Sequence, residues 1–236
     1  MSFSNKFANL FKAFLPAPFT IAVLLTGLTF LLAWALTQPQ QEDCHFIELL
    51  ENWEKGLWDG PLLVFALQMM LMLVLGHVLA LTKPINKLIE KASVYCNTTA
   101  NAAAIITLLT LMVSFFNWGL GLIFGAIFAR KVGEQAVQNK TPLHYPLIGA
   151  AGYSGMMVWH GGISGSAPIK IAEEGHFMEA QMGVISQSDT IFSSMNIVLS
   201  ILLLIVLPTA MYFIGKRSKN SSISLPIQQK TKSIEK

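Results

Sequence analysis

One stretch of the sequence decides the fold: Tyr153-Ser-Gly-Met-Met-Val-Trp-His-Gly-Gly-Ile-Ser-Gly-Ser-Ala-Pro168. It lies in an otherwise apolar segment, residues 145–168, and contains four glycines, three serines and a histidine. Each glycine weakens a helix by about 1 kcal/mol relative to alanine. Helical backbone that opens inside a bilayer must be buried by protein or line a wet cavity. The stretch therefore predicts a broken transmembrane helix, from which many transporters build a substrate site.

The composition is that of a membrane protein. Of the 236 residues, 53% are hydrophobic and 12% are charged, against about 25% charged in soluble domains. Several apolar runs reach the eighteen residues that predict a membrane-spanning helix. We therefore expect an all-α polytopic membrane protein. The Lys and Arg residues lie between the apolar runs, a pattern that reports membrane orientation, so no nucleic-acid partner is expected.

The order of segments predicts the following organisation. Residues 1–18 form a cytoplasmic interfacial amphipathic helix, and residues 216–236 a disordered cytoplasmic tail. Two scaffold spans, Phe19–Leu36 and Pro61–Leu81, lie in residues 19–81. Part of their acidic outer loop, residues 38–60, lies flat on the membrane surface. The remaining segments are a cytoplasmic connection at residues 82–98, a re-entrant hairpin at 99–131, the broken helix at 145–168 and a last span at 190–215.

The hairpin is one of two interpretations of an uncharged run, residues 99–129, which Asn117-Trp-Gly-Leu-Gly121 interrupts. The run is long for one span and short for two, so it is either a kinked span or a re-entrant hairpin with its tip near Asn117. A hairpin places fourteen of the sixteen Lys and Arg residues in the cytoplasm, whereas a full crossing places six there. The positive-inside rule favours the hairpin and puts both termini in the cytoplasm. Cys44 and Cys96 then lie on opposite sides of the membrane, and no disulfide is expected.

Six motifs occur in a fixed order: Leu15-Pro-x-Pro18, Gly76-His77, Asn117-Trp-Gly-Leu-Gly121, Phe128-Ala-Arg130, Trp159-x-Gly-Gly-x-Ser-Gly-Ser166 and Asp189-Thr-x-Phe-Ser193. Over residues 10–215 this series resembles the short-chain fatty acid transporter family of the ion-transporter superfamily. The resemblance implies one repeat of an inverted-repeat transporter, whose hairpin and broken helix meet at the substrate. It implies secondary transport of butyrate-like or acetoacetate-like monocarboxylates in a bacterial inner membrane. Since members of this family are about twice as long, the chain is expected to be an N-terminal half that pairs with a C-terminal half or forms a homo-oligomer.

The candidate substrate site combines the hairpin tip with the broken helix. Its predicted residues are Asn117, Trp118, Gly119, Gly121, Trp159, His160, Gly161, Gly162, Ser164, Gly165 and Ser166. No Lys or Arg lies in the apolar segments, so neutral donors such as backbone N–H groups, hydroxyls and an amide would hold a carboxylate. The two tryptophans would wall a short acyl tail, and His160 would donate to the carboxylate or carry a proton. Simple packing explains the glycines and tryptophans as well, and a neutral structural histidine explains His160.

No cofactor is expected, and the sequence leaves the coupling ion, proton or sodium, undecided. A non-transporting or regulatory subunit that needs a C-terminal partner is the main alternative function. An intramembrane serine protease is a remote one, because Gly162-Ile-Ser164-Gly165 fits a Gly-x-Ser-Gly pattern. That match is weak, since Gly152-Tyr-Ser154-Gly155 fits equally well. We therefore do not expect an enzyme.

Overall fold

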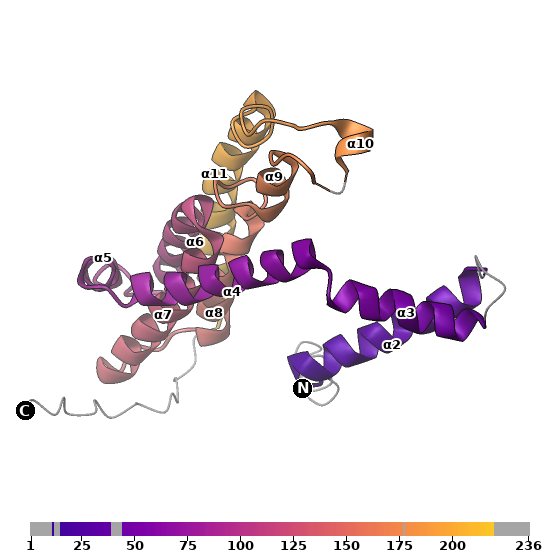
Figure 1. The fold of residues 1–236 in the computed structure, drawn as a ribbon. Helices are drawn as coiled ribbons and strands as arrows, with labels where there is room; N and C mark the ends of the chain where they lie inside the picture. Colours follow the sequence, from indigo (N-terminus) through magenta and orange to yellow (C-terminus); the bar gives the residue numbers. More distant parts are fainter. Residues whose placement is uncertain (1–10, 12–14, 39–43, 177, 220–236) are drawn as a thin grey trace, which may run out of the picture. The chain divides into compact units, whose positions relative to one another are not determined.

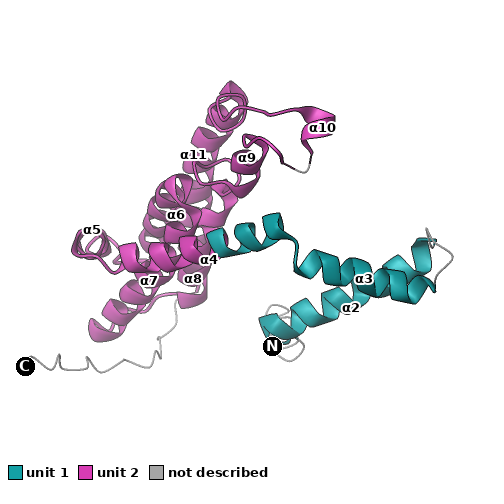
Figure 2. Cartoon of the chain, in the orientation of Figure 1, with its two compact units in different colours: residues 1–68 teal, residues 69–236 magenta. Residues whose placement is uncertain are grey.

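The computed structural model describes residue 11 and residues 15–38, 44–176 and 178–219. The predicted amphipathic helix of residues 1–18 and the predicted tail of residues 216–236 lie largely outside these residues. The described part is helical, without a β-strand (Figure 1). The chain forms two compact units, residues 1–68 and residues 69–236 (Figure 2), and each is considered by itself below.

The first unit contains two complete helices, α2 (Pro18–Leu36) and α3 (His45–Leu57). Helix α2 is apolar throughout and buries no residue. Helix α3 alternates acidic and apolar residues at helical spacing, and it packs against α2 with an edge-to-face contact between Phe30 and Phe46, whose ring centroids lie 5.4 Å apart. The acidic outer loop of the sequence is thus largely helical. Its placement on a membrane surface stays a prediction.

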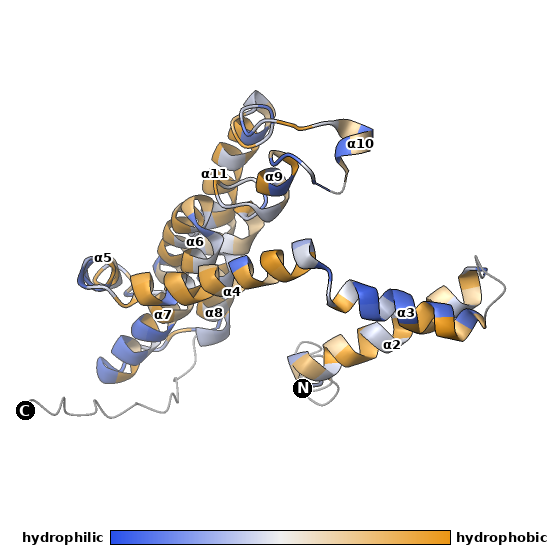
Figure 3. Ribbon diagram, in the orientation of Figure 1, coloured by the Kyte–Doolittle hydropathy of each residue, from blue (hydrophilic) through white to orange (hydrophobic). Residues whose placement is uncertain are grey.

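In the part of the chain that the structure describes, four helices are long and apolar enough to cross a membrane. They are α2, α4 (Gly60–Ala80), α6 (Thr99–Phe116) and α11 (Ser194–Arg217). Helices α2 and α4 begin and end within one residue of the two spans expected in residues 19–81. Half of the apolar window of α6 is buried inside the protein, against 6% or less in the other three. Helix α6 is therefore the central helix of its unit. The other three are coloured mostly hydrophobic in Figure 3 yet bury little of their apolar windows, as suits contact with lipid.

Helix α6 and helix α7 (Trp118–Gln138) form an antiparallel hairpin that turns at a single residue, Asn117. The side-chain oxygen of Asn117 accepts a hydrogen bond from the Leu120 N–H at 2.8 Å and so caps α7, a role in which Asn is among the preferred residues. The chain thus reverses at the expected tip. Because the structure contains no membrane, the re-entrant placement of this hairpin stays a prediction.

Helix α7 continues seven residues beyond the expected end of the hairpin at residue 131. This last part is amphipathic: Val132 and Ala136 are buried, whereas Arg130 and Glu134 form an ion pair at 2.8 Å on the exposed side. Figure 3 shows the same end of α7 in hydrophilic colours. The helix is longer than the apolar run because its buried face continues beyond Arg130, where charged residues occupy only the exposed face.

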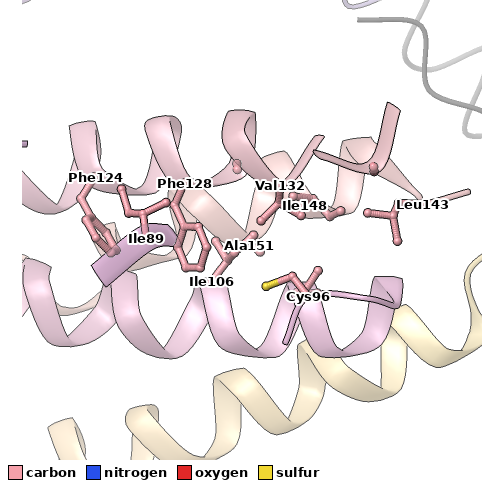
Figure 4. Close-up of a cluster of buried hydrophobic side chains, with 13 residues drawn as sticks. Ile89, Cys96, Ile106, Phe124, Phe128, Val132, Leu143, Ile148 and Ala151 are labelled. Atoms are coloured by element: carbon pink, nitrogen blue, oxygen red, sulfur yellow. The ribbon is translucent and has the colours of Figure 1, made fainter. Parts of the chain in front are cut away.

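The core of the second unit lies between the hairpin, α5 (Lys83–Ser93) and α8 (Tyr145–Tyr153). Its large side chains come from all four helices and interdigitate (Figure 4). They include Ile89, Ile106, Phe124, Phe128 and Ile148. This cluster fixes the arms of the hairpin against α8, and so positions the tip relative to the segment that follows α8.

That segment is the interrupted helix. Regular α-helix ends at Tyr153, a 3₁₀-helix follows at Ser154–Val158, and the backbone of residues 159–165 turns without forming a helix. A short helix α9 (Ser166–Ile171) comes next, and α10 (Glu179–Met182) lies in the connection to α11. The helix is therefore interrupted where the glycines and serines are concentrated. Its crossing of a membrane stays a prediction.

Candidate functional site

Two hydrogen bonds join the hairpin tip to the interruption. The backbone N–H of Trp118 donates to Ser164 Oγ at 2.9 Å, and the N–H of Ile163 donates to the Phe115 carbonyl at 2.8 Å. Gly162 permits this approach, because a Cβ there would lie 2.6 Å from the Phe115 oxygen. Two motifs that are 46 positions apart at the first bond therefore meet as one site.

An aromatic stack runs through the same place. The ring centroids of Trp118 and Trp159 lie 4.7 Å apart with an interplanar angle of 31°. Trp159 also stacks on His160, at 4.6 Å and 14°. Trp118 is buried and His160 is exposed, so the stack leads from the interior of the unit to its surface. Three of the predicted site residues are thus in one continuous contact.

Buried polar atoms without a hydrogen-bond partner concentrate on α6, the hairpin tip and the interruption. Of the six such side-chain atoms among the described residues, five belong to α6, the tip and the interruption: Thr107 Oγ1, Thr110 Oγ1, Ser114 Oγ, Trp118 Nε1 and Trp159 Nε1. Leaving a buried polar group unpaired costs about 1–3 kcal/mol. By contrast, the exposed Thr26 and Thr29 on α2 both donate to the carbonyl four residues earlier. Such a concentration is typical of places that take up water, an ion or a polar ligand.

Several of the predicted glycines have no room for a side chain. A Cβ at Gly119 would lie 3.2 Å from the Met72 carbonyl of α4, and one at Gly121 would overlap Ser114 on α6. Gly165 turns within the interruption, where a Cβ would lie 2.7 Å from the His160 carbonyl oxygen. Gly119 and Gly121 therefore shape the hairpin and its contact with α4.

Asn196 is a site residue that the sequence did not reveal. Its side-chain amide donates to the Gly161 carbonyl at 2.8 Å and to the Ile191 carbonyl at 2.7 Å. It thus connects the interruption to the segment before α11. The signal available in the sequence was weak: Ser193 is the N-cap of α11, accepting from the Asn196 N–H at 3.3 Å, but nothing near Asn196 indicates its distant partner.

The remaining predicted residues have simpler surroundings. The side-chain oxygen Oδ1 of Asn117 caps α7, which leaves the Nδ2 group of the amide as a donor. Ser166 begins α9 and is partly exposed. In the hydrogen bonds of the described residues, neither serine of the two Gly-x-Ser-Gly matches bonds a histidine: Ser164 accepts from Trp118, and Ser154 donates to the Ala151 carbonyl. No group of three or more His, Cys, Asp or Glu side chains in the described part of the chain could hold a metal ion.

The fold and this site define a polytopic helical membrane protein in which a helical hairpin meets an interrupted helix. A family described as "Short chain fatty acid transporter" matches residues 2–235, and the chain belongs to this family. Its resemblance to the family is thereby confirmed.

Two relatives show how much of the family's length the chain covers. A protein of Escherichia coli K12 is 38% identical over 194 residues, which are 82% of this chain and 42% of the relative. A protein of Haemophilus influenzae Rd is 34% identical over 218 residues, 89% of this chain and 46% of the relative. Both are named "Putative short-chain fatty acid transporter". The chain thus spans about half the length of these curated relatives. No solved structure matches it.

Proposed function

We propose that this chain forms one half of a secondary transporter for short-chain fatty acids of the butyrate or acetoacetate kind. The observation that carries the proposal is the hydrogen bond from the Trp118 N–H to Ser164 Oγ. It brings the hairpin tip and the interruption together at a buried place, as expected for a substrate site made from two discontinuous elements. The names of the two relatives support the same substrate class.

The chemistry of the site suits a small monoanion. Indole N–H groups can only donate, so the buried Nε1 atoms of Trp118 and Trp159 require an acceptor. A carboxylate provides two acceptor oxygens, and its short apolar tail would contact the indole faces. Asn117 Nδ2 would add a donor from the tip, and exposed His160 would receive the substrate at the outer end of the stack. The apolar segments contain no Lys or Arg that could bind a second carboxylate.

The coupling ion and the partner are part of the proposal. A proton could travel with the acid or through His160, whereas sodium would be held by carbonyl and hydroxyl oxygens such as those of Thr110 and Ser114. We place the protein in a bacterial inner membrane with both termini in the cytoplasm, where it works with a C-terminal half or as a homo-oligomer. The second candidate, a non-transporting or regulatory subunit, rests on the chain spanning about half of its relatives.

Uptake of radiolabelled butyrate into inverted and right-side-out vesicles tests this function. The chain is expressed alone and together with a polypeptide equivalent to the remaining part of a relative. Saturable uptake in either case, inhibited by acetoacetate but not by butyramide, supports the proposal, because butyramide has the same shape without the charge. Imposed proton and sodium gradients then identify the coupling ion. Absence of saturable uptake in both preparations contradicts the proposal and favours the regulatory subunit.

A further inference from the structure

Helix α5 has a row of lysines that the transport function does not use. Lys83, Lys87 and Lys91 follow one another at four-residue spacing, which places them on one face of the helix, and all three are exposed. Here they are called the lysine row. Among the described residues, none of the three is in an ion pair.

The nearby cations of α7 are neutralised within the protein. Arg130 pairs with Glu134 at 2.8 Å, and Lys131 Nζ lies 3.4 Å from Glu90 and 3.0 Å from the Asn86 side-chain oxygen. Glu90 is the only acidic residue of α5, so its contact with Lys131 leaves the lysine row without an acid on its own helix. The row therefore presents three positive charges outward.

The position of α5 in the chain places this row at a membrane surface. Two residues separate α5 from the end of α4, and five separate it from the start of α6. Both neighbours are apolar helices of membrane-spanning length, so the short connections keep α5 beside the ends of α4 and α6 (Figure 1), and α5 lies at a membrane surface if these two helices span it. Leu88 in the middle of α5, and Leu81 and Tyr95 just beyond its two ends, are exposed, as expected of side chains that enter the interfacial layer.

The opposite face of α5 is fixed to the hairpin. Ile89 is fully buried in the core, and Ile85 packs against the same cluster. Together with the contacts of Lys131 to Asn86 and Glu90, this packing attaches α5 to the base of α7. A ligand that binds the lysine row would therefore also restrain the base of the hairpin.

We propose that the lysine row binds the headgroups of anionic phospholipids and anchors the base of the hairpin to one leaflet. The charge of the row is complementary to the phosphate and its helical spacing spreads the three ammonium groups along the surface. The exposed apolar side chains of α5 enter the layer beneath the headgroups. This is a binding site for bilayer lipid, distinct from the substrate site at the tip.

The test measures lipid binding directly, without transport. The purified chain is placed in nanodiscs or vesicles of phosphatidylcholine with increasing phosphatidylglycerol, and a fluorescent phosphatidylglycerol reports binding. The triple substitution Lys83→Gln, Lys87→Gln, Lys91→Gln is compared with the charge-preserving Lys83→Arg, Lys87→Arg, Lys91→Arg. We expect the Gln variant to lose about tenfold or more in affinity, because each lysine near an anionic surface contributes to attraction, and the Arg variant to bind like the native chain.

Three further observations decide the proposal. Binding by the native chain should weaken at high salt, because ions screen charges at exposed surfaces. Circular dichroism and size-exclusion profiles of both variants should match those of the native chain, since the row faces away from the core. Equal affinity of the native and Gln chains, or equal loss in the Gln and Arg chains, would overturn the proposal. Since no substrate is involved, these outcomes are independent of whether the chain transports short-chain fatty acids.

Discussion

The Trp118 N–H and Ser164 Oγ are 2.9 Å apart, and this bond is buried. It satisfies a backbone donor in the first turn of α7, where helix geometry provides no intrahelical acceptor. The same bond fixes the turn after the 3₁₀-helix at Ser154–Val158. One hydroxyl therefore completes the end of a helix and holds the two halves of the proposed site together.

Replacing Ser164 with Ala should loosen the site. The variant leaves the Trp118 N–H buried without an acceptor, which costs about 1–3 kcal/mol. We expect a lower melting temperature in detergent and a reduced uptake rate. Ser166→Ala is the matched control for the melting temperature alone, because Ser166 begins α9 and is only partly buried. Equal melting temperatures for the two variants would show that the bond contributes nothing to stability.

The contact between Gly121 and Ser114 should behave as a coupled pair. A Cβ at Gly121 would overlap the Ser114 hydroxyl and lie 2.7 Å from its Cα. Gly121→Ala should therefore destabilise the hairpin despite the better helix propensity of alanine. Adding Ser114→Gly should restore part of the loss, with a coupling energy of about 0.5–3 kcal/mol in a double-mutant cycle.

Gly149→Ala in α8 is the control for that cycle, because a Cβ at Gly149 would have no atom within 4 Å. It should leave the melting temperature unchanged or raise it. Strictly additive effects of Gly121→Ala and Ser114→Gly would contradict a direct contact between these two positions.

Asn196 should act as a positioning residue for the interruption. Asn196→Ala removes both of its hydrogen bonds, to the carbonyls of Gly161 and Ile191. At about 0.5–1.5 kcal/mol for each bond, we expect a modest loss of stability, together with faster proteolysis of the chain between residues 159 and 165. Asn101→Ala, on an exposed position of α6, is the control. If proteolysis of this segment is unchanged, Asn196 does not hold the interruption.

The indole N–H groups of Trp118 and Trp159 should contribute to substrate affinity. Phenylalanine keeps an aromatic face but removes the donor, so Trp118→Phe and Trp159→Phe should each raise KM for butyrate. A loss of one hydrogen bond to a charged group, about 1.5–3 kcal/mol, corresponds to roughly a tenfold change or more. Trp58→Phe, at an exposed position, should leave KM unchanged. An unaltered KM in both site variants would assign the tryptophans to packing alone.

The two cysteines should differ sharply in reactivity. Both are free thiols; Cys44 is exposed, whereas Cys96, in the connection between α5 and α6, is buried. Burial raises the pKa of the Cys96 thiol to about 12, so Cys96 has almost none of the reactive thiolate form in the folded protein at neutral pH. We expect maleimide to modify Cys44 rapidly at pH 7.5 and Cys96 only after denaturation.

The raised pKa of Cys96 also makes the free energy of unfolding depend on pH in a predictable direction. Because the folded pKa is raised, the unfolded chain ionises first as the pH increases, and the stability due to the neutral buried thiol falls between about pH 9 and 12. Cys96→Ala should be less sensitive to this pH range in unfolding measurements made with Cys44→Ser as background. Rapid labelling of Cys96 in the native state would show that this region opens.

The sequence determined the elements whose limits depend on local chemistry. The limits of the uncharged apolar runs predicted the ends of α2 and α4 to within one residue. The reversal near Asn117 was predicted from the interruption of an uncharged run and from the distribution of Lys and Arg, and the structure adds that the Asn117 side chain caps α7. The glycines and serines of residues 153–168 likewise predicted an interruption, since they weaken helix locally.

The tertiary structure decided which residues act together. No periodicity indicates that Ser164 accepts from Trp118, that Asn196 donates to Gly161, or that α7 continues to Gln138. These contacts join positions far apart in the chain, or follow from a buried face that continues after the apolar run ends. Local propensity fixed where helices could begin and end. Only packing between the hairpin, α8 and α11 determined which hydroxyls, amides and indoles face one another, because those contacts depend on distance in space.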